Sequence, residues 1–195
     1  MKIIVILRKL IRIIVVLIFR VDRWHTSLLD HRDYAQDVIL ELNKCVDRQS
    51  ILEIGCGLGD IVGNVNYRRK YFFDISINVL RAAKALQYIS CRKSENVYKV
   101  FDLLRDVVDS QLKLDAIVIV NFMHGFSSKD LFPKLEKLVK VNLKSDGVLV
   151  FDIIESNPAY KHNHSISDLI FIEKFNITVL DRYRFGRKLV IARLR

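Results

Sequence analysis

The stretch ILEIGCGLGD, residues 51–60, joins a short apolar run to three glycines at alternate positions. Glycine can adopt positive φ and lets a ligand come close to the backbone. A strand, a glycine-rich turn and a helix open a doubly wound nucleotide-binding unit, in which the open N–H groups of the helix face polar or anionic parts of the ligand. The stretch therefore predicts a binding site for a nucleotide-like molecule.

The spacing of the glycines separates two classes of nucleotide site. The dinucleotide fingerprint is GxGxxG, but here the glycines are Gly55, Gly57 and Gly59. Asp60 occupies the position of the third glycine of that fingerprint, so an NAD-dependent enzyme is disfavoured. The pattern E-x-G-x-G-x-G, which begins at Glu53, resembles the first motif of the class I S-adenosylmethionine-dependent methyltransferases. The resemblance implies that S-adenosylmethionine is the cofactor.

Two acids that follow the next predicted strands add to this resemblance, which covers about residues 27–195. Asp74 ends the run YFFD, where a carboxylate can accept hydrogen bonds from two ribose hydroxyls, as it does in members of the family. Asp102 follows KVF, where the family often has an acid near the adenine amino group. A helix N-cap is the structural alternative for Asp102. The cofactor-binding residues that the resemblance implies are Glu53, Gly55, Cys56, Gly57, Gly59, Asp74, Ile75, Asp102, Leu103, Asn121 and Phe122.

Methyl transfer from a sulfonium requires that the two reactants are positioned and that a proton is removed, and it needs no metal. The segment LDAIVIVNFMHGF resembles the fourth strand of the family and its exit, which lies beside the methyl donor. His124 is therefore the predicted general base. Local hydrogen bonding that shapes the loop is its structural alternative.

Two polar segments are candidates for the acceptor site. The loop ESNPAYKHNHSISD follows the fifth strand and should reach over the carboxyl ends of the strands. The segment VDRWHTSLLDHRDYA precedes the first strand, where family members often fold a segment over the site. For Trp24 a role as a core anchor is the favoured alternative, and for the loop it is a solvated surface. The candidate acceptor residues are Trp24, His25, Tyr34, Glu155, Tyr160, His162 and His164.

Hydrophobic periodicity alternates between helix and strand from about residue 50 onward, which indicates an α/β fold. Gly59 and Asp74 lie fifteen residues apart, against the ~20 usual between the glycine loop and the acid, so the first crossover helix must be short. Helices are expected near 27–45, 59–66, 77–88, 103–111 and 130–143. Strands are expected at 50–55, 71–75, 97–101, 115–122, 148–154, 175–183 and 187–194.

Pro133 fits only near the first turn of its helix. With the resemblance, these elements predict a doubly wound, mostly parallel seven-stranded sheet with an antiparallel C-terminal hairpin and helices on both faces. Residues 27–195 form the expected methyltransferase domain.

Residues 1–26 form a separate basic and apolar segment. On a helix its basic residues fall within an arc of about 120°, and Arg8, Lys9 and Arg12 interrupt the apolar run, which disfavours a membrane-spanning helix. The expected amphipathic helix could lie on an anionic membrane surface. Alternatively, it packs its apolar face on the domain or on a second subunit of a homodimer.

The net charge of +10 is concentrated at the chain ends. Residues 1–23 hold six basic residues against Asp22, and residues 181–195 hold six against Asp181, so the part between them is neutral. A nucleic-acid enzyme more often has basic charge around its cleft. We therefore expect a small-molecule acceptor such as a sugar or another metabolite. The alternatives are an RNA or protein methyltransferase that uses the basic ends, and a non-catalytic cofactor-binding or anchoring module.

The cysteines, Cys45, Cys56 and Cys91, are odd in number and form no CxxC pair. This pattern disfavours a disulfide framework and a zinc site. A reducing cytoplasm is the expected location, with contact to a membrane surface through the N-terminal helix as an addition.

Overall fold

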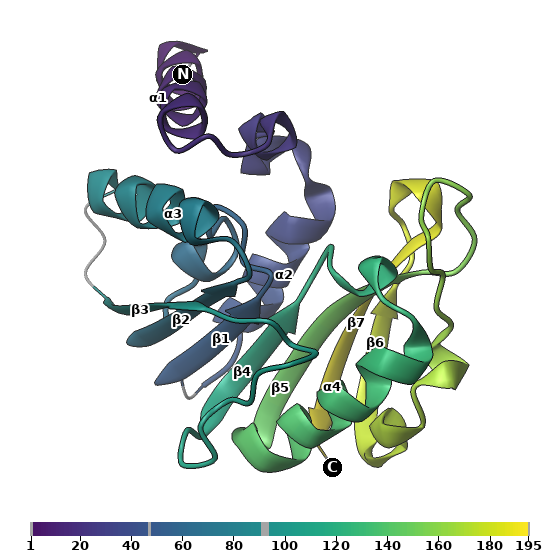
Figure 1. The fold of residues 1–195 in the computed structure, drawn as a ribbon. Coiled ribbons are helices and arrows are strands. Elements are labelled where there is room, and N and C mark those ends of the chain that lie inside the picture. Colours follow the sequence, from purple (N-terminus) through teal and green to yellow (C-terminus); the bar gives the residue numbers. More distant parts are fainter. Residues whose placement is uncertain (1, 47, 91–93, 195) are drawn as a thin grey trace.

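The computed structural model describes residues 2–46, 48–90 and 94–194, in which seven strands form one sheet (Figure 1). The strand order is β3-β2-β1-β4-β5-β7-β6. Neighbouring strands from β3 to β5 are parallel, and β7 is antiparallel to both β5 and β6, which confirms the predicted sheet. The strands are β1 (Ser50–Ile54), β2 (Arg69–Asp74), β3 (Glu95–Val100), β4 (Leu114–Ile119), β5 (Leu143–Ile154), β6 (Phe175–Leu180) and β7 (Arg187–Leu194).

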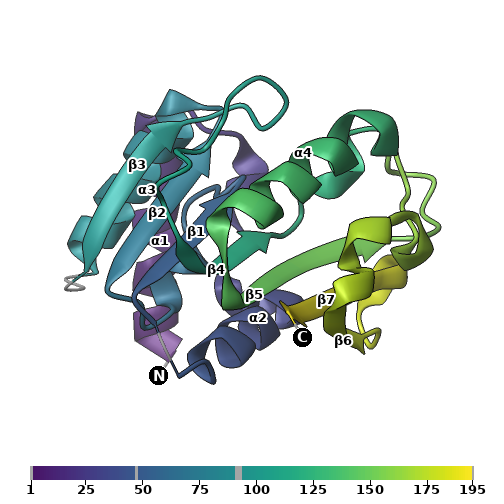
Figure 2. The same ribbon diagram turned by 90° about the horizontal axis from the view of Figure 1, so that it is seen from below.

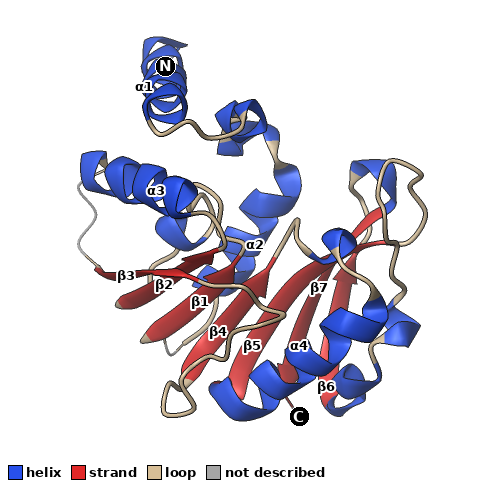
Figure 3. Cartoon of the chain, in the orientation of Figure 1, coloured by secondary structure: helices blue, strands red, loops and turns tan. Residues whose placement is uncertain are grey.

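Helices cover both faces of this sheet (Figures 1 and 2). The α-helices are α1 (Lys2–Ile18), α2 (Asp33–Asn43), α3 (Ile77–Ile89) and α4 (Ser128–Asn142). Short 3₁₀ turns connect many of the elements (Figure 3). They are η1 (Arg23–Thr26), η2 (Leu29–His31), η3 (Val62–Asn64), η4 (Met123–Gly125), η5 (Ile166–Asp168), η6 (Ile170–Lys174) and η7 (Arg184–Gly186).

The core has two layers, one on each side of the sheet. On one side α4 packs Leu131 and Leu135 over Phe151 and its neighbours. On the other side α2 and α3 pack over β1 and β2, with Leu42 and Leu80 in the same apolar cluster. All six residues of β4 are buried, as expected for a parallel strand that is covered on both faces.

Two predicted helices are absent. The helix expected near 59–66 is the single turn η3, because the crossover between β1 and β2 is short and fills its space with apolar side chains such as Ile61 and Tyr67. The segment 103–111 forms turns. Asp102, just before it, and Asp109 within it each accept a hydrogen bond from the backbone N–H two residues on, at 2.9 Å. Such bonds compete with helix formation.

Two helix details also differ from expectation. The first helix of the domain begins at Asp33 rather than near residue 27, because η1 and η2 occupy the preceding residues. Pro133 is the sixth residue of α4 and so lies in its second turn. The carbonyl group left without a donor there belongs to Lys129, which is exposed and can bind water.

The N-terminal helix α1 rests on α3 (Figure 1). Val15 and Val16 are buried in one cluster with Leu58 of the glycine turn and with Val79 and Ala82 of α3. Among the residues that the structure describes, no helix joins enough length to enough apolar character to cross a membrane.

Candidate functional site

The glycine turn follows β1 at the carboxyl end of the sheet. Gly57 has a φ of 53° and Gly59 a φ of 73°, a region that L-residues rarely adopt. A Cβ on Gly59 would lie 2.6 Å from the ring of Phe72, so this glycine is needed for packing on β2. A Cβ on Gly57 would instead meet the imidazole of His25 at 3.3 Å. Gly57 is therefore the glycine whose open side faces the N-terminal segment.

The N–H groups of this turn are used inside the protein. Cys56 donates to the Phe73 carbonyl at 3.0 Å, and Gly59 donates to the Cys56 carbonyl at 2.8 Å. Gly57 donates to the Asp74 carboxylate at 3.0 Å. The turn is followed by the single 3₁₀ turn η3 in place of the expected helix, so these three N–H groups of the turn bind within the protein.

Asp74 ends β2 opposite the glycine turn. Its carboxylate accepts from Gly57 N–H and Ser76 N–H, both at 3.0 Å. Burial raises the pKa of Asp74, and these N–H bonds oppose the rise. The backbone N–H of Ile75 also acts on this carboxylate. Because a carboxylate has about four lone-pair sites, capacity for a hydroxyl donor remains. Beside it Ile75 is 69% exposed and presents an apolar side chain at the edge of the site.

Glu53 and Cys56, two further residues expected in the first motif, are buried. Glu53 is buried and accepts from Val62 N–H at 2.9 Å, so it holds η3 against β1. Burial raises the pKa of Glu53 to about 8. Burial also raises the pKa of the Cys56 thiol, which makes it an inert core thiol.

After β3, Asp102 caps a turn and not a helix. Its Oδ1 accepts from Leu104 N–H at 2.9 Å, and its Oδ2 lies 3.4 Å from Arg105 Nε. Leu103 is buried in the apolar cluster under α4. Of Asp102 and Leu103, Asp102 is the residue whose polar side chain stays partly exposed.

The segment before α2 closes over the glycine turn. His25 is buried and stacks on Trp24 with a ring-centroid distance of 3.5 Å. Burial, and then the charge of Arg12, lower the pKa of His25 to about 4, so its ring is neutral at pH 7. Trp24 is 60% exposed, so the interpretation of this residue as a core anchor is wrong.

Asp60 fastens the N-terminal segment to the turn, a role that sequence reasoning missed. Arg12 of α1 binds both carboxylate oxygens of Asp60, at 2.7 and 2.6 Å, and Arg32 adds a second ion pair. The Nε of Arg12 also donates to the His25 carbonyl at 2.5 Å. Burial would raise the pKa of Asp60, but the two arginines outweigh it and lower the pKa. Arg12 and Asp60 are 48 residues apart, so no local pattern reveals the pair.

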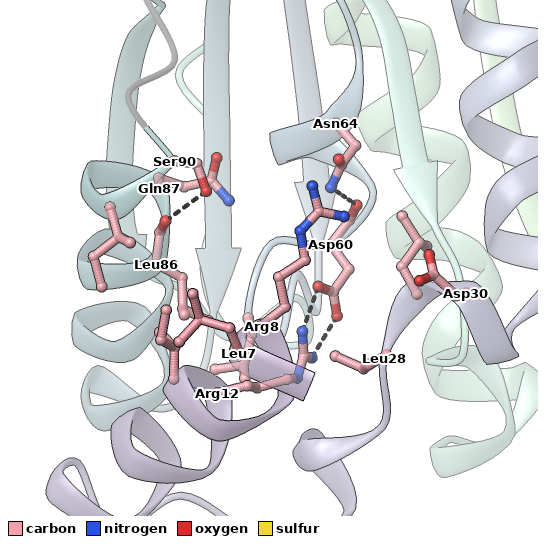
Figure 4. Close-up of a pocket in the computed structure, with 14 residues that line it drawn as sticks. Leu7, Arg8, Arg12, Leu28, Asp30, Asp60, Asn64, Leu86, Gln87 and Ser90 are labelled. Atoms are coloured by element: carbon pink, nitrogen blue, oxygen red, sulfur yellow. Dashed lines mark hydrogen bonds and ion pairs between the residues drawn. The ribbon is translucent and has the colours of Figure 1, made fainter. Parts of the chain in front are cut away.

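Two cavities flank this ion pair. The smaller, of about 230 Å³, brings together many of the predicted residues. Its wall includes Trp24, His25, Tyr34, Glu53, Gly55, Cys56, Gly57 and Asn121. The larger, of about 520 Å³, lies between α1 and α3. Figure 4 shows Arg12 reaching Asp60 at its wall, between Leu86 and Leu28.

The exit of β4 is held by a buried ion pair that the sequence did not reveal. Arg187 of β7 pairs with Asp152 of β5, and both residues are buried. Asp152 accepts from Asn121 N–H at 2.6 Å, and Arg187 donates to the Asn121 side-chain carbonyl at 3.1 Å. The guanidinium also lies 4.3 Å from the ring centroid of Tyr34. Together these contacts fix Asn121 with a φ of 57° at the cavity wall.

His124 lies in η4, just beyond Asn121. Its ring contacts Tyr160 at a centroid distance of 4.1 Å, and its carbonyl accepts from His162 N–H at 3.3 Å. Burial, and then the charge of Arg187, lower the pKa of His124 to about 4, so the imidazole is neutral at pH 7. Three of the predicted residues, His124, Tyr160 and His162, therefore lie together at this exit.

Other predicted residues face elsewhere. His164 is buried and its Nε2 lies 3.0 Å from the Met123 carbonyl, so it is a structural residue and its predicted acceptor contact is wrong. Glu155 pairs with Lys188 at 2.6 Å on the surface. Phe122 packs its ring on Gly55, where it would lie 2.5 Å from an added Cβ. Within the described ranges, no three His, Cys, Asp or Glu side chains form a group that could hold a metal ion.

Solved structures share this fold. The magnesium protoporphyrin IX methyltransferase of Synechocystis PCC 6803, with bound S-adenosylhomocysteine, is 14% identical over 90% of this chain and 88% of its own, with a TM-score of 0.69. This chain has the class I methyltransferase fold. The N-methyltransferase NodS of Bradyrhizobium japonicum WM9, in complex with S-adenosylhomocysteine, is 15% identical over 86% and 89% of the two chains, with a TM-score of 0.70.

A third structure of this fold is an S-adenosylmethionine-dependent methyltransferase of Clostridium acetobutylicum ATCC 824. It is 16% identical over 83% of this chain and 91% of its own, with a TM-score of 0.63. No family model matches the sequence, and no curated protein matches it. The likeness is thus one of fold, in which the carboxyl ends of the parallel strands form the binding edge.

Proposed function

We propose that this chain is an S-adenosylmethionine-dependent methyltransferase that acts on a small molecule, such as a sugar or another metabolite. The observation that carries the proposal is the Asp74 carboxylate, which faces the Gly57 turn with hydrogen-bonding capacity to spare. The fold supports it, because solved structures that share this fold include methyltransferases with S-adenosylhomocysteine bound.

The residues around the turn fit such a cofactor. Asp74 would accept the two ribose hydroxyls, and the exposed side chain of Ile75 would lie along the adenine. Asp102 would lie near the adenine amino group. Gly57 gives the ligand close access to the backbone, and Asn121 lies across the small cavity from it. When bound, the cofactor supplies a methyl group on a positively charged sulfur.

The rest of the reaction depends on the side chains at the β4 exit. His124 accepts the proton of the acceptor hydroxyl or amine, because its lowered pKa keeps the imidazole neutral. Tyr160 packs on that ring and fixes its orientation. Trp24 and His25 lie over the turn and exclude water from the cavity.

The distribution of charge supports a small acceptor over RNA. Four basic residues of the C-terminal region are paired with acids of the same molecule. The pairs are Arg182 with Asp37, Arg187 with Asp152, Lys188 with Glu155, and Arg193 with Glu41. Free thiols at Cys45 and Cys56 also support the proposed cytoplasmic location.

Calorimetry followed by an acceptor screen tests the proposal. The protein should bind S-adenosylmethionine and S-adenosylhomocysteine but not NAD, and it should transfer labelled methyl to a component of a small-metabolite pool. Transfer to tRNA or rRNA fragments with steep salt dependence would support the RNA alternative instead. Binding without transfer to any pool would support the non-catalytic module. No heat with either nucleoside would contradict the proposal.

A further inference from the structure

The outward side of α1 is an apolar face. At 3.6 residues per turn, about 100° per residue, positions 6, 10, 14 and 17 fall on one side of a helix. The exposed fractions of the five residues on this face lie between 46% and 67%. We call them the α1 face; they are Ile6, Leu10, Ile14, Leu17 and Ile18.

An ion pair fixes which side of α1 points outward. Arg12 lies on the opposite side of the helix and is buried against Asp60, with both of its terminal nitrogens bonded to that carboxylate. Val15 and Val16 are buried beside it against α3. The helix therefore cannot roll to bury the α1 face without breaking this pair. The sequence-based alternative in which the helix packs on the domain holds for Val15 and Val16, which are buried against α3, while the α1 face stays exposed.

The charges around the α1 face are mostly positive, although the exposed Asp22 lies between Arg20 and Arg23 and offsets one of them. Residues 1–21 contain no acid. Lys9 flanks the face, and Arg20 and Arg23 follow the end of the helix, all three exposed. A second copy of the chain that docked through this face would bring these cations together, and like charges oppose association. An anionic bilayer neutralises them, and lysine and arginine side chains can reach headgroups from a helix that lies in the interface.

We propose that the α1 face docks this protein on an anionic membrane surface, with the helix in the plane of the interface and the domain held above it by Arg12 and Asp60. This inference is independent of the proposed methyltransferase activity. It concerns a surface that lies outside the glycine turn and the β4 exit.

Vesicle flotation of the full chain tests the apolar part. The protein should bind vesicles of 70:30 phosphatidylcholine and phosphatidylglycerol at least tenfold more tightly than vesicles of phosphatidylcholine alone. The double variant L10S/L17S should lose at least tenfold of this affinity. The matched control is L40S/V107S, which changes two residues of similar exposure elsewhere and should stay within twofold of wild type.

A second pair of variants tests the charge. K9Q/R20Q should lower the affinity for the anionic vesicles by about fivefold for each cation removed. K134Q/K137Q, on the far side of the sheet, should leave the affinity unchanged. Thermal unfolding of every variant checks that the fold is retained.

Two results would overturn the proposal. One is vesicle binding by L10S/L17S within twofold of wild type, or no binding by wild type. The other is a wild-type dimer in light scattering that L10S/L17S converts to a monomer while neither protein binds vesicles, which would assign the α1 face to a second copy.

Discussion

On the β1–β2 side of the cleft the Asp74 carboxylate is held by two backbone N–H groups, whereas on the β4–β5 side the Asp152 carboxylate is paired with Arg187. The first acid is half-buried and keeps lone pairs for a ligand. The second is buried, and its charge is neutralised within the protein. Asp74 therefore keeps capacity to bind a ligand, whereas Asp152 fixes the backbone at the exit of β4.

The largest expected effect is on stability at the β4–β5 side, which we call the acceptor side because it carries the exit of β4. Arg187→Met leaves the Asp152 charge buried without its partner, which should lower the free energy of unfolding by about 3–5 kcal/mol. Urea denaturation measures this change. The double variant D152L/R187M removes both charges and should recover most of the loss. If the single variant costs less than about 1 kcal/mol, the ion pair does not support this side of the cleft.

The second-largest expected effect is on turnover, when the proposed general base His124 is replaced. His124→Gln should lower kcat about a hundredfold, or about 2.7 kcal/mol, because the proton acceptor is lost. His31→Gln, an exposed histidine outside the predicted site residues, is the control and should stay within threefold. Turnover by the His124 variant within threefold of wild type rules out the base role.

The ionisation of His124 gives a check that needs no acceptor. Its lowered pKa means that its ring signals in a pH titration should move with a midpoint near pH 4. A midpoint near 6.5, the ordinary value, would show that the ring is not desolvated beside Arg187.

A smaller effect is expected at the N-terminal segment. Asp60→Asn removes the charge that binds Arg12 and Arg32, and should lower the local stability of α1 by about 2 kcal/mol, as measured by amide hydrogen exchange. The exposed Asp22→Asn is the control. The folded pKa of Asp60 is lowered, so this stability is present above about pH 3.9 and is lost as the pH falls through the folded value. Equal exchange in α1 for wild type and variant would mean that Asp60 does not fasten the segment.

Sequence patterns predicted the β1–β2 side well because its signals are local. Gly57 and Asp74, which contact each other, are only 17 residues apart and belong to consecutive strands. Alternating apolar segments also predicted the sheet and its hairpin. The helix expected near 59–66 failed because periodicity alone cannot tell a short buried crossover from a helix.

Most contacts on the acceptor side could not be predicted from the sequence. Arg187 and Asn121 are 66 residues apart, and only the pairing of β7 with β5 brings them together. The Arg12–Asp60 pair was equally out of reach, because its two residues are 48 positions apart. Trp24 was misjudged because a large aromatic residue is usually buried, whereas here it covers a cavity.

The central claim is that Asp74 binds the ribose of a methyl-sulfonium nucleoside, and a cycle of protein and ligand variants tests it most directly. Calorimetry would compare S-adenosylhomocysteine with its 2′-deoxyribose analogue, on wild type and on Asp74→Asn. Each single change should weaken binding by about tenfold, and both together should cost little more than one, because they remove the same hydrogen bond. Fully additive losses, or an Asp74→Asn protein that binds the natural ligand as tightly as wild type, would contradict the account.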